Sequence, residues 1–232
     1  MDKIGIIGAM DEEVNQLKEK MEKVQVKRKA AMDFYSGKLE SKDVVIVRSG
    51  IGKVNAAVCT QILVDEYKID AVINTGIAGS LKPEINIGDM VISTDALQHD
   101  VDVTGFGYEY GVIPRMETSI FKSDEALAKK AQNICSQVNS DISVFLGRIV
   151  SGDQFIDGKE KKNWIAGQFA GYCTEMEGGA IAQTAYLNKV PFLIIRAISD
   201  KADDSAHMDY GKFEAEAIAH TVKFITALIP VL

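Results

Sequence analysis

The chain alternates between short apolar runs and longer segments in which apolar residues recur every three or four positions. Such runs predict β-strands, and the spacing of three or four predicts helices with one buried face. Strands are expected at Ile4–Gly8, Phe34–Leu39, Val44–Val47, Ala71–Asn74, Met90–Ser93, Val144–Val150 and Pro191–Ile198. Helices are expected at Lys53–Tyr67, Ser123–Val138, Lys159–Phe169, Gly179–Asn188 and Lys212–Leu228, and the charged stretch Lys18–Lys29 is also expected to be helical.

Most of these strands are apolar throughout, so both of their faces need cover. The intervening helices supply that cover, which predicts an α/β fold of three layers, αβα, around a central twisted sheet. The pair of strands within Phe34–Val47 makes the sheet mixed rather than purely parallel. Because the chain has no linker-like stretch and no internal repeat, residues 1–232 are expected to form one domain.

Composition excludes several classes of partner. The net charge is -7, so binding to nucleic acid or to an anionic membrane is not expected. Cys59, Cys135 and Cys173 are odd in number and widely spaced, which favours reduced thiols and no metal site. No apolar stretch reaches the roughly 18 residues of a transmembrane helix, and no leader is recognisable, so the expected location is cytoplasmic.

Glycines occur in the first predicted strand and the turn after it, at Gly5–Met10, and follow three other predicted strands, at Ser49–Gly52, Thr75–Ser80 and Ser151–Asp153. The first segment lacks the full G-x-G-x-x-G spacing, and no second strand is expected near Lys18–Lys29, so a dinucleotide site is disfavoured. Tight turns alone account for most such glycines. Together, however, they would let a flat ligand approach the backbone at the carboxyl edge of the sheet, where ligands bind in open α/β folds.

Acidic residues also follow predicted strands. Helix capping explains Asp11 and Glu12, because carboxylates favour helix N-termini, and on residue pattern alone Glu13 is a similar helix-start acid. Capping explains Glu177 and Asp200 less well, since both lie at the ends of buried strands. These two carboxylates are therefore the stronger candidates for chemistry.

Eight collinear segments resemble the 5'-methylthioadenosine/S-adenosylhomocysteine nucleosidases, a family of the purine nucleoside phosphorylase/uridine phosphorylase superfamily. They are GIIGAMDEEV, SGIGKVNAA, INTGIAGS, GDMVIS, HDVDVTGFGYEYG, IVSGDQFI, TEMEGGAIA and VPFLIIRAISDKAD. The resemblance implies hydrolysis of the N-glycosidic bond of 5'-methylthioadenosine, S-adenosylhomocysteine and 5'-deoxyadenosine, which releases adenine. It further implies a role in methionine salvage and S-adenosylmethionine recycling, with adenine nucleosides as the partners, no cofactor and no metal.

The resemblance also implies roles for individual residues. Asp200 matches the acid that protonates adenine N7, Glu13 the residue that binds and polarises the attacking water, and Glu177 the ligand of the ribose hydroxyls. Met176 would pack under the sugar, Phe155 and Ile156 would hold the base, and Ser199 and Arg196 would orient the acid and the ribose-side network. Gly79 and Glu175 are further implied substrate-binding residues. The pocket for the 5'-substituent would be lined by Met10, Ile51, Val103 and Tyr210. A loop that each subunit of a homodimer would donate to its partner contains Phe106, Tyr108 and Pro114.

This sequence departs from the family pattern at Ile77, where many members have serine, which bears on affinity and on the range of substrates. Futalosine-type nucleosides share the adenosine core and remain alternative substrates. Two other functions remain open: phosphorolysis of a purine nucleoside, for which Arg48 is the one candidate anion ligand, and nucleoside binding without catalysis. The apolar loop at Phe106–Pro114 predicts a homodimer, with a local lid over the site as the alternative.

Overall fold

The structure, a computed structural model, describes residues 1–203 and 206–232, with residues 207–212 described by their backbone alone. The strands are β1 Lys3–Gly8, β2 Glu22–Lys29, β3 Met32–Leu39, β4 Lys42–Arg48, β5 Ala71–Ser80, β6 Met90–Gln98, β7 Phe121–Lys122, β8 Val144–Ser151, β9 Cys173–Glu175 and β10 Phe192–Asp200. The α-helices are α1 Asp11–Glu19, α2 Lys53–Ile62, α3 Glu125–Val138, α4 Lys159–Phe169, α5 Gly178–Asn188 and α6 Ala206–Leu228. A π-helical turn at Leu63–Tyr67 continues α2, and 3-10 turns lie at Thr104–Phe106 and Ile229–Val231.

The strands form one mixed sheet with β5 at its centre. Parallel neighbours β1 and β10 flank β5, and β4, β3 and β2 extend the sheet beyond β1. On the other side β10 pairs antiparallel with β6, β6 pairs with β8, β8 with β9, and β9 with β5. These pairings close five strands into a ring, so the carboxyl ends of strands that are distant in sequence meet at one place.

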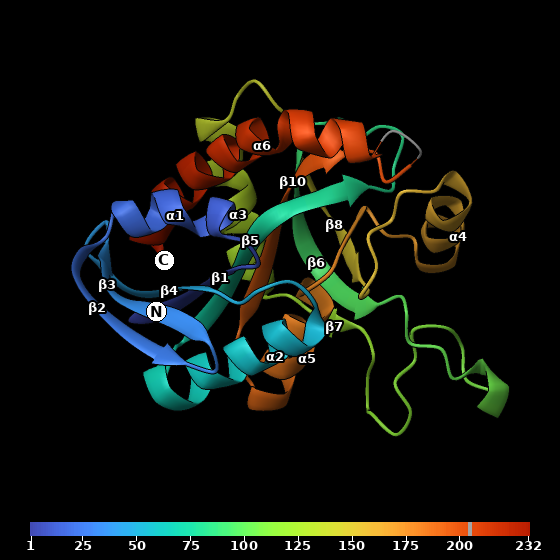
Figure 1. Cartoon of the computed structure of the whole chain (residues 1–232), viewed down its shortest axis with the longest axis horizontal. Helices are drawn as coiled ribbons and strands as arrows, with labels where there is room; N and C mark the ends of the chain where they lie inside the picture. Colours follow the sequence, from blue (N-terminus) through green and yellow to red (C-terminus); the bar gives the residue numbers. More distant parts are fainter. Residues whose placement is uncertain (204–205) are drawn as a thin grey trace.

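Helices cover both faces of the sheet, which confirms the predicted mixed sheet between helical layers (Figure 1). Helices α1, α3 and α6 pack over one face, where Leu17, Ala131 and Phe224 are fully buried against the strands. Helices α2 and α5 pack together over the opposite face, where Cys59 and Ile181 are fully buried. Helix α4 lies at the end of the sheet next to β8. Every residue of β5 is buried, as expected for a strand covered on both faces.

One predicted helix is wrong. The stretch Lys18–Lys29 contains the end of α1 and then the strand β2, in which every residue is exposed. Strand β2 pairs only with β3 and forms the edge of the sheet. Charged residues are common on edge strands because they discourage pairing with another chain, and here Lys27 and Lys29 both pair with Glu66.

Several strands run further than their apolar cores predict. Residues Thr75–Ser80, expected as a turn, continue β5, and β6 extends to Gln98. The strand expected at Pro191–Ile198 runs on to include Ser199 and Asp200, the last residues of β10. Pairing with neighbouring strands in the closed ring satisfies the backbone of these polar and glycine-rich ends, so they remain extended. Asp124 caps the start of α3, since its Oδ1 accepts a hydrogen bond of 2.8 Å from the Leu127 amide.

Candidate active site

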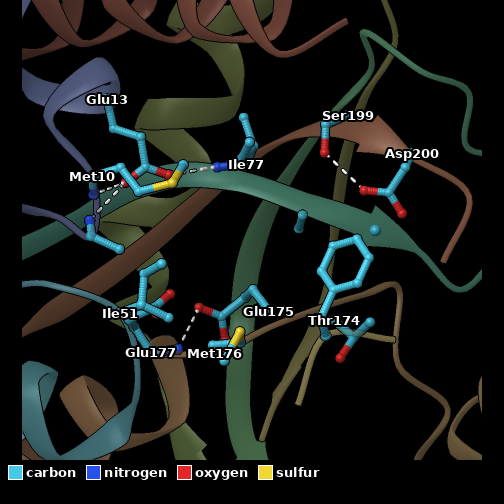
Figure 2. Close-up of a pocket in the computed structure, with 14 residues that line it drawn as sticks. Met10, Glu13, Ile51, Ile77, Thr174, Glu175, Met176, Glu177, Ser199 and Asp200 are labelled. Atoms are coloured by element: carbon cyan, nitrogen blue, oxygen red, sulfur yellow. Dashed lines mark hydrogen bonds between the residues drawn. The ribbon is translucent and has the colours of Figure 1, made fainter. Parts of the chain in front are cut away.

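A pocket of about 300 Å³ opens where the carboxyl ends of β1, β5, β9 and β10 meet the first turn of α5 (Figure 2). This is the edge at which open α/β sheets bind their ligands. The pocket is lined by Ala9, Met10, Glu13, Ile51, Ile77, Ala78, Gly79, Phe155, Thr174, Glu175, Met176, Glu177, Ser199 and Asp200. Four of these residues carry carboxyl groups, and none is lysine, arginine or histidine.

Glu13 reaches the pocket from the first turn of α1 and is only 5% exposed. Its Oε2 accepts hydrogen bonds from the amides of Ala9 (2.6 Å) and Met10 (3.0 Å), and its Oε1 accepts one from Ile77 (3.2 Å). Burial raises the pKa of the Glu13 carboxyl, while the positive charge of Arg196 and the three amides oppose the rise. Glu13 is therefore more than a helix-start acid, because it joins α1 to β5.

The close approach of Glu13 to β5 depends on a glycine. A Cβ at Gly76 would overlap Glu13 Oε1 and would lie 3.3 Å from Arg196 Nη1. Only a residue without a side chain leaves room there for the carboxylate. The Thr75–Ser80 segment is therefore important as a strand rather than as a turn.

Asp200 ends β10 on the opposite side of the pocket from Glu13 and is 2% exposed (Figure 2). Its Oδ2 accepts a hydrogen bond of 2.9 Å from Ser199 Oγ, and its Oδ1 accepts one of 2.7 Å from the Ala202 amide. A Cβ at Gly79 would lie 2.7 Å from Asp200 Oδ1, so this glycine opens the space in front of the acid. Ser199, which the resemblance gives the role of orienting the acid, thus lies within hydrogen-bonding distance of Asp200.

Beneath the pocket, Arg196 and Glu175 form a buried ion pair. Glu175 accepts hydrogen bonds from Arg196 Nη2, from Ser151 Oγ and from the amides of Glu177 (3.1 Å) and Gly178 (2.7 Å). Arg196 is 1% exposed and also donates to Asn74 Oδ1. A buried pair needs this degree of hydrogen bonding to offset its desolvation. Glu175 thus neutralises the arginine nearest to the pocket.

Glu177 faces the pocket from the start of α5. Its Oε1 accepts a hydrogen bond of 2.8 Å from the Gly52 amide, and its Oε2 lies 3.9 Å from Arg196 Nη2. Burial, and after it the neighbouring charge of Glu175, raise the pKa of Glu177 to about 8, while Arg196 and the Gly52 amide oppose the rise. Glu175 already pairs with Arg196 Nη2, so Glu177 has the weaker contact with this guanidinium.

Other predicted site residues are only partly gathered here. Met10, Ile51, Gly79, Phe155 and Met176 line the pocket, and Ile156 lines a small adjoining cavity of about 40 Å³. Val103, Phe106, Tyr108 and Pro114 do not line it within one chain, and Phe106 is 85% exposed. The side chain of Tyr210 lies outside the described residues. Arg48 is also outside the pocket, in an ion pair of 3.4 Å with Asp11.

The residue pattern did not single out Asn74 or Ser151, which hold Arg196 and Glu175. Asn74 is one polar residue at the end of an apolar run, and a fully buried amide needs a partner. That signal is visible in the sequence. Ser151 is likewise a buried polar residue at the end of an apolar run, as the last residue of β8.

The described residues were also compared with the patterns of a metal site and of a membrane-spanning helix. Residues 1–203 and 206–232 contain no group of three or more His, Cys, Asp or Glu side chains arranged to hold a metal ion. Within the same described part of the chain, no helix is both long enough and apolar enough to cross a membrane.

The fold and the pocket define a class of protein, and comparisons with known proteins place the chain in it. Residues 3–230 match the family model of the phosphorylase superfamily. A 5'-methylthioadenosine/S-adenosylhomocysteine nucleosidase of Bacillus thuringiensis subsp. konkukian (strain 97-27) is 42% identical over 98% of both chains. The chain therefore belongs to the 5'-methylthioadenosine/S-adenosylhomocysteine nucleosidase family of the phosphorylase superfamily.

Solved structures agree with this assignment. The nucleosidase of this family from Neisseria meningitidis, in complex with methylthio-immucillin-A, superposes with a TM-score of 0.95 at 39% identity over the whole of both chains. A futalosine hydrolase of Helicobacter pylori strain 26695 superposes with a TM-score of 0.94 at 30% identity over 100% of this chain and 98% of its own. The fold is thus shared by relatives described with different nucleoside substrates.

Proposed function

We propose that this protein hydrolyses the N-glycosidic bond of 5'-methylthioadenosine and S-adenosylhomocysteine, and also of 5'-deoxyadenosine, and releases adenine. Family membership and the inhibitor bound by the Neisseria meningitidis relative support the proposal. The observation that carries it is the placement of two buried carboxyl groups, Glu13 and Asp200, on opposite sides of one pocket. Cleavage of a glycosidic bond by water needs an acid on one side and a water-binding base on the other.

Asp200 is the proposed general acid. Adenine is a poor leaving group as an anion, and a proton on N7 makes it neutral as the bond from C1' to N9 breaks. Ser199 and the Ala202 amide fix both oxygens of the carboxyl group, so its direction is set before the substrate arrives. Gly79 leaves the space in front of Asp200 open to a flat base.

Glu13 is the proposed ligand of the attacking water. Three amides hold its carboxylate beside the pocket, and these hydrogen bonds favour its charged form. As the bond to adenine breaks, positive charge develops on the sugar, and a nearby carboxylate stabilises that charge and accepts a proton from the water. The oxygen of the water then bonds to C1', and the proton delivered by Asp200 leaves with adenine.

The remaining lining residues suit a nucleoside. Glu177 and Met176 line the pocket; Glu177 would bridge two ribose hydroxyls, and Met176 would pack under the sugar. Phe155 is 42% exposed at the pocket and would stack on adenine, while the backbone of Ile156 would bond the edge of the base. These contacts would hold C1' in line between the water and the acid.

The 5'-substituent is proposed to lie against Met10 and Ile51, whose side chains are apolar and line the pocket. An apolar surface favours a thioether over a charged group. One relative, from Helicobacter pylori, is described as a futalosine hydrolase. A futalosine-type nucleoside is therefore the substrate to compare with the thio-substituted adenosines. Rates on 5'-methylthioadenosine, S-adenosylhomocysteine, 5'-deoxyadenosine and futalosine therefore rank the substituents.

Phosphorolysis, the alternative considered from the sequence, depended on Arg48. That residue lies outside the pocket, and the residues described as lining the pocket include no cation for a phosphate ion. Arg196 lies nearby but is paired with Glu175. The geometry therefore favours water over phosphate as the nucleophile.

A homodimer in the cytoplasm, acting in methionine salvage, completes the proposal. Apolar side chains are exposed in the turn before α2, on α2 itself and in the segment after β6: Ile51, Val54, Val58 and Phe106. Exposed apolar groups of this size are typical of an interface between proteins. Analytical ultracentrifugation should give a dimer at working concentration; a fully active monomer would contradict the dimer.

The function is tested by measuring adenine release from 5'-methylthioadenosine with and without inorganic phosphate. We expect the same rate in both conditions, with the free methylthioribose as the second product. A strict requirement for phosphate would establish phosphorolysis instead. Tight binding of the nucleoside without any release of adenine would establish a binding protein.

A further inference from the structure

Three charged side chains join three separate segments at the rim of the pocket. Lys53 Nζ lies 2.6 Å from Asp100 Oδ1, and Asp100 Oδ2 accepts a hydrogen bond of 2.9 Å from the Asp153 amide. Asp153 Oδ1 in turn accepts a hydrogen bond of 2.8 Å from the Lys53 amide. These contacts close a ring of Lys53, Asp100 and Asp153, which we name the rim clasp.

Two of the three segments joined by the rim clasp lead directly to the pocket. The turn before Lys53 supplies Ile51 to the lining and the Gly52 amide to Glu177. The segment that follows Asp153 supplies Phe155 to the lining. The clasp therefore ties the ribose-side wall of the proposed site to its base-side wall.

The clasp is partly protected from water and its geometry is tight. The side chains of Lys53 and Asp100 are 18% and 15% exposed, so their attraction is screened less than that of a surface pair. Gly52 has φ +96°, a conformation that glycine favours, and a Cβ there would lie 3.1 Å from Asp153 Oδ1. Burial opposes the charge on Asp100, but the bonds to Lys53 and to the Asp153 amide lower its pKa below the ordinary value.

The segments that the clasp joins lie outside regular elements. Residues 152–158 form no regular element between β8 and α4, and residues 99–103 form none after β6. Backbone hydrogen bonds anchor the strand ends, from the His99 amide to the Ser151 carbonyl (2.8 Å) and from the Gly152 amide to the Glu175 carbonyl (3.1 Å). Beyond the strand ends, Ile156 packs in a buried apolar cluster, and the Gly111 amide donates to the Val101 carbonyl (2.8 Å). The clasp adds a link between charged side chains at the pocket rim.

We propose that Lys53 and Asp100 are positioning residues for the nucleosidase reaction, which hold the Ile51–Gly52 turn and the Phe155 segment at the separation that a bound nucleoside requires. The inference rests on the proposed function for its substrate. Neither residue lines the pocket, so both act through Gly52, Glu177 and Phe155. Loss of the clasp should loosen both walls of the pocket. It should therefore weaken substrate binding more than it slows the reaction of the bound substrate.

The test compares wild type, Lys53→Met and Asp100→Asn, with Arg148→Met as the matched control. Arg148 forms an ion pair of 2.6 Å with Asp95, with side chains 27% and 19% exposed, and neither residue lines the pocket. We expect KM for 5'-methylthioadenosine to rise about tenfold in both clasp variants, with a smaller fall in kcat. The control should keep kcat/KM within about twofold of wild type.

Hydrogen–deuterium exchange separates positioning from general damage. Residues 50–58 and 151–158 should exchange faster in both clasp variants and at the wild-type rate in the control, while the core strand β5 stays protected. If a substitution only unfolded part of the enzyme population, the apparent kcat would fall with the fraction of folded enzyme, and KM would stay unchanged. Unchanged exchange in both segments together with an unchanged KM would overturn the proposal. If wild type releases no adenine, the proposed function fails, while the exchange result still decides whether the clasp holds the two walls.

Discussion

Replacing Glu177 with glutamine should change how stability depends on pH, because this carboxyl group is held in an unusual protonation state. Burial and then the charge of Glu175 raise its pKa from the ordinary 4.5 to about 8. Between these two values the folded protein holds a proton that the unfolded chain has lost. Unfolding therefore releases a proton, and the stabilisation present at low pH is lost as pH rises through the folded pKa.

The size of the effect follows from proton linkage. One group that is protonated only in the folded state changes the free energy of unfolding by about 1.4 kcal/mol per pH unit. From about pH 5.5 to about pH 7.5, wild type should therefore lose about 2 to 3 kcal/mol relative to Glu177→Gln, whose amide does not titrate. The matched control is Glu160→Gln, which alters an exposed carboxylate on α4.

Urea unfolding of the ligand-free proteins at a series of pH values provides the measurement. The difference in unfolding free energy between wild type and Glu177→Gln should slope with pH, and the difference between wild type and Glu160→Gln should be flat. Parallel curves for wild type and Glu177→Gln would show that Glu177 is ionised in the folded protein. The account of the buried carboxyl groups around Arg196 would then be wrong.

Two further predictions concern the water side of the pocket. Burial raises the pKa of Glu13, so kcat/KM should increase with pH as this carboxyl group loses its proton, and Glu13→Gln should abolish that increase together with most of the activity. Steady-state rates across pH check both effects, and an active Glu13→Gln variant would remove the assignment. Gly76→Ala should displace the Glu13 carboxylate and lower kcat by about a hundredfold. Gly167→Ala, whose Cβ meets no atom within 4 Å, is its control, and equal rates for the two variants would refute the steric argument.

The sequence predicted the layers well because they depend on apolar periodicity. Helix α4 was predicted with the observed bounds Lys159–Phe169, and α5 to within one residue. Edge strand β2 was missed because its residues are charged and exposed, and its strand state depends on pairing with β3. That pairing is a tertiary contact that no local pattern contains.

The candidate site shows the same limit. Asp200 stands out in the sequence because a carboxylate at the end of a buried strand is costly without a purpose. Glu13 does not stand out, since its burial depends on the amide of Ile77 in a distant strand. Lys53 and Asp100 are ordinary charged residues until the fold brings them within 2.6 Å. Residues 103–114 stay away from the pocket in one chain, so their proposed role depends on a second copy.

The most direct test of the central claim is a single-turnover measurement on Asp200→Asn with 5'-methylthioadenosine. An amide keeps the shape of the side chain but cannot protonate N7, so adenine release should fall by about 10² to 10⁴-fold while nucleoside binding is retained. The comparison substrate is a 5-methylthioriboside with a leaving group that needs no proton, such as 4-nitrophenolate. The substitution Asp200→Asn should slow its hydrolysis far less than it slows adenine release. Adenine release at the wild-type rate by Asp200→Asn would contradict the assignment of Asp200 as the acid.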